Sequence, residues 1–441
     1  MLREKKNVIL PSSNNLNIGM TAIVGVLNKH AVAIAADSAI TMSGPLGRKV
    51  LNRANKIFML SKYHPIGIMI YNSAALMGVP WDVIIKLYRK QLCEKSFPKL
   101  TDYQTDFIDF ITKKSFFTDS NVHLTYLGSF VRDVVINEIG NEAGRLCGGI
   151  RDDNKLDVIE KMKFLMDDFI SKILGLEQCE SLNGYTIEEF RKYSDPVFED
   201  LLEKLKELSP DANFREKAEK LIFNLLKAEN PIVPFTGIVF TGYGDEEIYP
   251  ELVTINVSLV IDRKLRYYND RSRAVSITED NNSAVMPFAQ TDVMNTVLSG
   301  VDPHLEDIFA INFKKTIMKY GGIIADIVEP VNKSIADSIR GLDISSLINE
   351  FTNSNQEIKK KEYIVPLVRA IASLEKEDLI DVAESLISLT SLKRRMTFAE
   401  ESVGGPVDVA VISKGDGFIW IKRKHYFDPS LNSHFFTNYF K

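Results

Sequence analysis

Short apolar runs rich in Val, Ile and Ala, separated by polar turns, begin at residue 21 and continue to residue 71. Residues 21–27 (TAIVGVL) and 31–37 (AVAIAAD) are almost continuously apolar, which predicts a hairpin whose strands are buried on both faces. A second apolar pair, at residues 56–60 and 66–71, predicts another hairpin. The polar, glycine-containing residues 41–55 between the two pairs predict a loop.

Helical spacing of apolar residues begins after the second hairpin. Ser73 is a candidate helix cap and Pro80 permits a fresh start, after which one face carries Ile84, Leu87, Tyr88 and Leu92. A further helix is expected across residues 130–139.

Between residues 151 and 229 the composition shifts to three charged amphipathic helices. They form either a docking surface for a partner helix or a helical insertion that packs its own apolar stripes, and the second arrangement is the commoner one. Residues 305–395 also predict helices, and their clearest apolar stripe comprises Leu379, Val382, Leu386 and Leu389.

Strands return at residues 235–241 and 251–261, and the chain closes with a hairpin around Asp416-Gly417. Runs of strands and runs of helices that are segregated in this way indicate an α+β fold rather than alternating βαβ units. Two sheets packed face to face with helices outside would satisfy the order of elements. The first and last hairpins are then expected to share one sheet.

Composition narrows the classes of function. The net charge of −5 and the pI near 5.8 give no basic footprint, so nucleic acid is not expected as a partner. The sequence has no apolar run long enough to span a membrane. Residues 1–20 are polar and are interpreted as a leader or propeptide, without the apolar core of a secretory signal. The three cysteines and six scattered histidines predict neither a disulfide framework nor a metal site, which fits a cytoplasmic protein.

Three residues stand out as candidates for chemistry: Thr21, Asp37 and Lys56. Asp37 ends the second predicted strand and Lys56 opens the third. Charged groups at the ends of buried strands are commonly paired, so we expect an Asp37–Lys56 ion pair. By itself such a pair is more often structural than catalytic.

The segment from Thr21 to Thr41 resembles the opening of a proteasome β-subunit and of its bacterial two-component protease relatives. The family begins its mature chain with a Thr-led strand and a hairpin that ends in Ala-Ala-Asp-Ser, and the spacing from Thr21 to Asp37 is the same. Lys56 matches the family's Lys, after a slightly longer loop. Residues 237–255 are similar to the central hairpin of the family, and residues 403–421 to its closing segment and last two strands. These matches cover about half of the chain.

The resemblance implies a four-layer αββα sandwich of the N-terminal-nucleophile (Ntn) hydrolases across residues 21–441, with residues 151–229 as a helical insertion. It implies that the Thr21 hydroxyl is the nucleophile and that the freed α-amine of Thr21 is the base. Such an amine has a pKa of about 7.7–8.0, suited to base catalysis, and the cation of Lys56 would lower it further. Asp37 would orient Lys56. An internal Thr21 has an amide instead, so the chemistry requires removal of residues 1–20.

The chain departs from the family pattern at three places. Tyr71-Asn72 stands where the family has Gly-Gly, whose backbone amide helps form the oxyanion hole; a backbone N–H survives any side chain, although Gly would adopt the geometry more freely. Glu400 and Val403 fall where the family has Asp and Ser, and Ser402 could supply the hydroxyl in a shifted register. Met20, rather than Gly, directly precedes Thr21.

From this resemblance we expect a cytoplasmic threonine-dependent hydrolase that cleaves peptides or proteins, uses no cofactor and forms a homo-oligomer. Two alternatives stay open: a catalytically inactive proteasome-like assembly or binding protein, and an amidase acting on non-peptide substrates. Nothing in the sequence identifies an ATPase partner.

Overall fold

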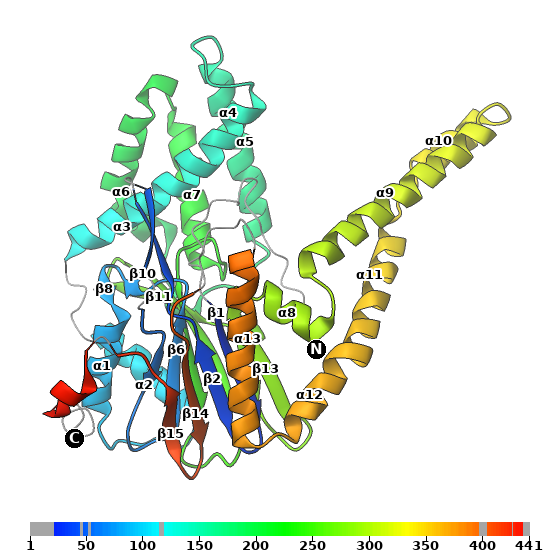
Figure 1. Ribbon diagram of the computed structural model, residues 1–441. Helices are drawn as coiled ribbons and strands as arrows, with labels where there is room; N and C mark the ends of the chain where they lie inside the picture. Colours follow the sequence, from blue (N-terminus) through cyan, green and yellow to red (C-terminus); the bar gives the residue numbers. More distant parts are fainter. Residues whose placement is uncertain are drawn as a thin grey trace.

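The computed structural model describes residues 22–434 except for 45–46, 52–53, 114–118, 397–403 and 426 (Figure 1). Two antiparallel sheets form its centre. The first sheet has the strand order β13-β1-β2-β14-β15. Its members are β1 (Ala22–Asn28), β2 (Val32–Ala36), β13 (Ser283–Ala289), β14 (Asp408–Ser413) and β15 (Gly417–Lys422).

The first and last hairpins of the chain share this sheet, as the sequence predicts. Strand β2 pairs with β14 in antiparallel register, so that Ile34 lies opposite Ala410. Every residue of β1, β2 and β14 is buried. The near-continuous apolar runs therefore reflect strands that are covered on both faces.

The second sheet has the order β11-β10-β9-β6-β5, with a short strand β12 paired to β10. Its hydrogen-bonded neighbours β6 and β9 bring residues far apart in the sequence together, and Ile70 lies opposite Ile238. The strands are β5 (Ile57–Met59), β6 (Ile66–Tyr71), β9 (Thr236–Gly242), β10 (Glu251–Ile261), β11 (Lys264–Asn269) and β12 (Val275–Ser276).

The two sheets pack face to face through a shared apolar core. Ile23 and Ile412 from the first sheet meet Met69 and Val239 from the second in one buried cluster. The outer face of the first sheet carries α8 (Asp292–Ser299), α12 (Val365–Ala372) and α13 (Lys376–Met396), which join it in a second cluster. The outer face of the second sheet carries α1 (Trp81–Leu92), α2 (Leu100–Lys113) and α3 (Ser120–Arg132). The layers are helix, sheet, sheet and helix, and the predicted α+β class is confirmed.

The three amphipathic helices expected between residues 151 and 229 are present (Figure 1). Their apolar faces are buried in the same cluster as the second sheet, so these stripes are covered within the molecule. A π-helical turn, η3 (Asp133–Gly140), continues α3 and covers most of the helix expected at 130–139. The helices of this layer are α4 (Asn141–Leu146), α5 (Lys155–Ile173), α6 (Ile187–Lys204) and α7 (Ala212–Lys227), with the short turns η4 (Glu180–Leu182) and η5 (Lys206–Leu208).

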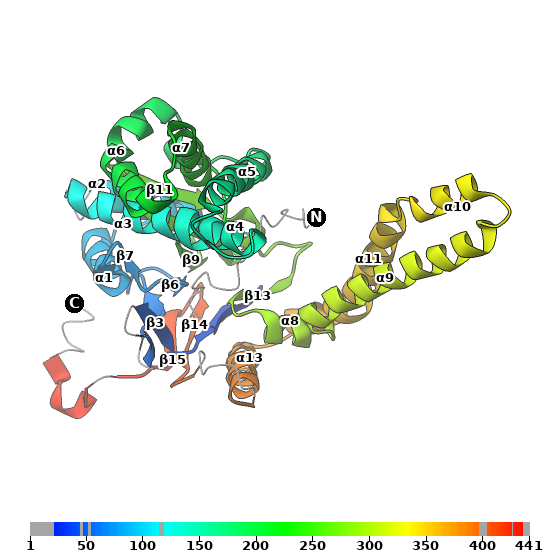
Figure 2. The same cartoon turned by 90° about the horizontal axis from the view of Figure 1, so that it is seen from above.

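A helical arm projects away from the layered body, as Figure 1 and Figure 2 show. Its hairpin packs lightly: within α9 only Ala325 is buried, and within α10 only Ala336. Phe313 and Phe351 stack between two arm helices, with ring centroids 4.1 Å apart. The arm comprises α9 (Pro303–Val328), α10 (Lys333–Arg340), α11 (Ser345–Lys359) and the turn η7 (Lys360–Ile364).

Some local predictions are wrong. The expected loop at 41–55 contains a two-stranded ribbon, β3 (Ile40–Gly44) and β4 (Gly47–Leu51), in which Gly44 lies opposite Gly47. Ser73 caps no helix, because its hydroxyl donates to the carbonyl of Ala75 at 2.8 Å. A small hairpin of β7 (Ala75–Leu76) and β8 (Val79–Pro80) follows before α1 begins.

The apolar stripe of α13 is slightly rotated from its predicted position. Leu379 and Leu386 are buried, whereas Leu389 is 43% exposed and Ile387 takes its place in the core. Elsewhere the cysteines are free thiols, and Cys93 is exposed. Over the described residues no helix is both long and apolar enough to cross a lipid bilayer. The remaining short turns are η6 (Arg271–Arg273) and η8 (Pro429–Leu431).

Candidate functional site

The predicted Asp37–Lys56 ion pair is present between the two sheets. Asp37 directly follows β2 and Lys56 directly precedes β5, so the pair joins one sheet to the other. The Nζ atom of Lys56 lies 2.7 Å from Oδ1 of Asp37, and the two side chains are 4% and 0% exposed. Lys56 also donates to the carbonyl of Ala39 at 2.5 Å. The ammonium group is therefore shared between one carboxylate and one backbone oxygen.

The Asp37 carboxylate also organises three backbone segments. Its Oδ1 accepts the N–H of Ala22 at 2.8 Å, at the start of β1. Its Oδ2 accepts the N–H of Ala39 at 3.0 Å and that of Gly404 at 3.2 Å. Three amides and one ammonium satisfy a carboxylate that would otherwise be very costly to bury. This one side chain thus connects the first strand, the loop after β2 and the segment before β14.

Burial dominates the electrostatics of Lys56. It lowers the pKa of the ammonium from its usual value, because desolvation disfavours the charged form, while the neighbouring Asp37 acts in the opposite direction. A second ion pair close by, between Lys424 and Asp408, contributes weaker and opposed effects on the Lys56 pKa. The Asp37 carboxylate thus partly offsets the desolvation that disfavours the charged form of Lys56.

Thr21 and Glu400 lie outside the described residues, as do Val403, at the position of the family's Ser, and the alternative Ser402. Thr21 is bonded covalently to Ala22, whose N–H binds Asp37. The Asp37–Lys56 pair is therefore one residue away, along the chain, from the nucleophile that the sequence suggests. The backbone of Asp37 binds Ala22 as well, because the N–H of Asp37 donates to the carbonyl of Ala22 at 3.1 Å.

Tyr71 and Asn72, the residues at the position of the family's Gly pair, lie at the end of β6. Asn72 has φ of +69°, in the left-handed region that glycine prefers and that Asn tolerates better than most residues. Its backbone thus adopts the conformation that a glycine would supply. The proposed contribution of the Tyr71 or Asn72 backbone amide to an oxyanion hole stays a prediction.

The Tyr71 side chain is fixed by its neighbours rather than free to move. Its hydroxyl donates to Oδ1 of Asn256 at 3.3 Å, and burial raises the pKa of the phenol to about 12. Gly237 is its partner on β9, and a Cβ atom at Gly237 would lie 2.0 Å from Cζ of Tyr71. The ring therefore occupies the space that any side chain at position 237 would need.

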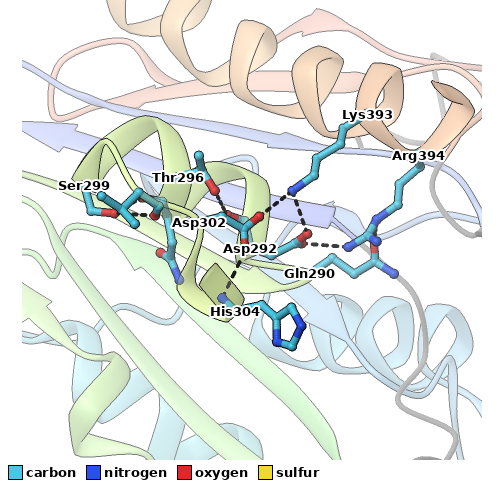
Figure 3. Close-up of polar contacts among 10 residues, drawn as sticks. Gln290, Asp292, Thr296, Ser299, Asp302, His304, Lys393 and Arg394 are labelled. Atoms are coloured by element: carbon cyan, nitrogen blue, oxygen red, sulfur yellow. Dashed lines mark hydrogen bonds and ion pairs between the residues drawn. The ribbon is translucent and has the colours of Figure 1, made fainter. Parts of the chain in front are cut away.

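A polar network borders the start of β1 from the other side (Figure 3). Ala289 is the register partner of Ala22, and Gln290 follows it. Arg394, at the end of α13, donates to Gln290 at 2.8 Å and to Asp292 at 2.7 Å. The neighbouring Lys393 binds Asp302 at 2.9 Å, and this links α13 to the base of the arm.

The sequence gives little sign of this network. Arg394 and Gln290 are separated by 104 residues, and each belongs to a segment that the sequence assigns only to helix or connection. Basic residues such as Lys393 and Arg394 are common in the last turn of a helix, because the helix dipole favours positive charge there. Only the packing of α13 across the first sheet brings these groups beside β1. Within the same described residues, no cluster of three His, Cys, Asp or Glu side chains is placed to hold a metal ion.

Comparison with known proteins finds distant structural likenesses. No protein-family model matches the chain. No curated protein matches it significantly. Among solved structures, a mutant of Anbu from Hyphomicrobium sp. strain MC1 superposes with a TM-score of 0.28 at 8% identity, over 95% of this chain and 94% of that one. Anbu from Yersinia bercovieri, described as an ancestral β-subunit, gives a TM-score of 0.25 at 9% identity over the same shares of the two chains.

Proposed function

We propose that the chain is a threonine-type Ntn hydrolase with a proteasome-like αββα fold, and that it cleaves peptide bonds. The observation that carries the proposal is the Asp37 carboxylate, which binds both the Lys56 ammonium and the N–H of Ala22. A buried cation is thereby held next to the beginning of β1. The helix–sheet–sheet–helix order of layers supports the same class of fold.

The proposed reaction starts with hydrolysis of the bond between Met20 and Thr21, which frees the α-amine of Thr21. The Thr21 hydroxyl then attacks the substrate carbonyl while its proton passes to that amine, directly or through water. When the tetrahedral intermediate collapses, the C–N bond breaks and the proton moves to the departing amine. Water attacks the resulting ester, and the acid product leaves as the Thr21 hydroxyl is restored.

The cation of Lys56 has a specific task in this scheme. A positive charge near the α-amine disfavours its protonation, so the amine stays available as a base near neutral pH. Asp37 holds Lys56 in place and compensates its charge in the low-dielectric space between the sheets. The backbone N–H of Tyr71 or Asn72 would stabilise the oxyanion, at the end of a strand whose geometry is fixed by packing.

The test combines processing with labelling. We expect the intact mass of the natively expressed protein to correspond to a chain that begins at Thr21. A peptide epoxyketone or β-lactone should then modify this residue, and the adduct can be located by tandem mass spectrometry. A stable chain that retains residues 1–20 and resists both electrophiles would rule out the proposed chemistry.

Two variants separate catalysis from folding. Lys56→Met is expected to abolish labelling of Thr21 and peptide hydrolysis. Lys424→Met removes the cation of the other buried ion pair, with Asp408, whose side chains are 10% and 4% exposed. The Lys424→Met variant should be destabilised to a similar extent, because it also leaves a buried carboxylate without its cation. It should still react, because Lys424 is not bonded to Asp37. Equal loss of reaction in both variants would indicate a purely structural role for Lys56.

A further inference from the structure

For its length, the projecting arm carries far more exposed large hydrophobic residues than the rest of the described chain. Fifteen of the 33 exposed large hydrophobic residues in the described chain lie within residues 303–364. This segment is about one seventh of the protein. Where such exposed apolar residues line up along one face of a helix, they mark a protein interface.

Five of the nine exposed large hydrophobic residues of α9 lie on one stripe along the helix, and the other four lie off it. The inner face of the helix points toward α10 and α11 through Phe313 and the buried Ala325. A second stripe lies roughly 100° away around the helix, at the usual rotation per residue. Its positions, at alternating steps of three and four residues, are Leu305, Phe309, Asn312, Thr316, Tyr320, Ile323 and Ile327.

The apolar members of this second stripe face solvent. Their exposed fractions run from 43% for Leu305 to 70% for Ile327. An apolar stripe repeating at this spacing is the surface that a helix presents to another helix. In one copy of the chain nothing among the described residues covers it.

The stripe is symmetric about its central residue, Thr316. Its members lie four, seven and eleven residues on either side of that position. An antiparallel copy of the same helix would place Leu305 against Ile327 and Phe309 against Ile323. Asn312 would meet Tyr320, and Thr316 would meet its own copy on the axis. A two-fold interface requires such self-complementary pairing, and here Tyr320 would offer its ring to the apolar surface and its hydroxyl to Asn312.

We propose that two copies of the chain associate through this stripe, with their α9 helices antiparallel and centred on Thr316. The two stripes together supply ten large apolar side chains, each about half exposed. At roughly 100 Å² of exposed surface for each side chain, complete burial of all ten would remove on the order of 1,000 Å², which is the lower range of specific interfaces. The arm helices of the two copies would then form a helical bundle between the two layered bodies.

The charges near the axis predict how the dimer depends on salt. Lys315 and Lys319 flank Thr316 on one side of the stripe, and an antiparallel copy places them near their own counterparts. This repulsion is screened by salt, so the dimer is expected to tighten as ionic strength rises. Lys315→Glu would face Lys319 of the second copy and should tighten the dimer at low salt.

The first test is sedimentation equilibrium of the full-length protein over a range of concentrations. Ile323→Asp and Phe309→Asp place a charge in the stripe, and we expect each to raise the dissociation constant at least tenfold. Met318→Asp is the matched control, because Met318 is 59% exposed on α9 but lies off the stripe. Circular dichroism should show the same helix content in all three variants. A monomeric parent protein, or equal effects of the stripe and control variants, would overturn the proposal.

The second test locates the axis. In a Cys93→Ser background, Thr316→Cys is expected to form a covalent dimer on mild oxidation, whereas Met318→Cys is not. Failure of Thr316→Cys to cross-link in a protein that sediments as a dimer would place the interface elsewhere. Neither test depends on hydrolysis, so the arm proposal and the proposed function can fail separately.

Discussion

Asp37 and Lys56 bind each other across 2.7 Å in a space from which solvent is almost entirely excluded. A buried ion pair of this kind adds little net stability, because desolvation of the two charges offsets their attraction. Its position is therefore more informative than its strength. It joins the two sheets and binds the first described residue of β1.

The first prediction concerns how strongly Asp37 and Lys56 depend on each other. Lys56→Met leaves a buried carboxylate without its cation, and we expect a loss of about 3–5 kcal/mol in the free energy of unfolding. Asp37→Asn should cost about as much, because it also weakens the hydrogen bonds from the backbone amides of Ala22, Ala39 and Gly404. The double variant should cost clearly less than the sum of the two. Additive effects in denaturant unfolding would contradict a coupled pair.

The second prediction is a pH dependence that follows from the lowered pKa of Lys56. Between that pKa and the ordinary value of about 10.4, the unfolded chain binds more protons than the folded one. The free energy of unfolding contributed by this group must therefore rise with pH in that window, by at most about 1.4 kcal/mol per pH unit.

The comparison protein for this measurement is the double variant Asp37→Asn/Lys56→Met, which has neither group. The difference in unfolding free energy, parent minus double variant, should increase with pH between the folded-state pKa of Lys56 and pH 10. A difference that decreases over this range would mean that the folded protein raises the pKa of Lys56.

The third prediction tests the close contact between Tyr71 and Gly237. Gly237→Ala would drive a methyl group into the buried Tyr71 ring and is expected to destabilise the protein by about 3 kcal/mol or more. Gly415→Ala is the control, because no atom lies within 4 Å of a Cβ there and its effect should stay within about 0.5 kcal/mol. Thermal unfolding of the two variants distinguishes them. Equal stabilities would show that the ring has room to move.

The fourth prediction concerns the backbone at Asn72. Its φ of +69° costs an alanine about 1–2 kcal/mol, whereas glycine adopts it freely. Asn72→Ala should therefore destabilise the protein and Asn72→Gly should not. If the amide at this position forms the oxyanion hole, Asn72→Gly should also retain electrophile labelling of Thr21. Loss of labelling in a stable Asn72→Gly variant would assign the function to the side chain instead.

Local pattern determined much of the fold. Residues 66–71 and 251–261 are strands with the bounds that the sequence predicts, because the first is a compact apolar run, the second has apolar residues at alternate positions or closer, and turn residues flank both. The Asp37–Lys56 pair was also predictable, since the ends of buried strands confine charged groups that must find partners. The two-stranded ribbon in the expected loop at 41–55 was not predictable, because its strands pair only with each other and carry no strong apolar pattern.

Tertiary structure alone decided the surroundings of the site. Strand β13 pairs with β1 although it contains Pro287, which a sheet tolerates only at an edge, and no local pattern distinguishes this strand from a loop. The same pairing brings Gln290 beside β1, where Arg394 reaches it from a helix 104 residues later. The sequence by itself determined which segments are buried strands and helices and where two opposite charges must meet, because these depend on neighbours in the chain. The tertiary structure decided which distant side chains border the site and that the arm stands apart, because these depend on how whole layers pack.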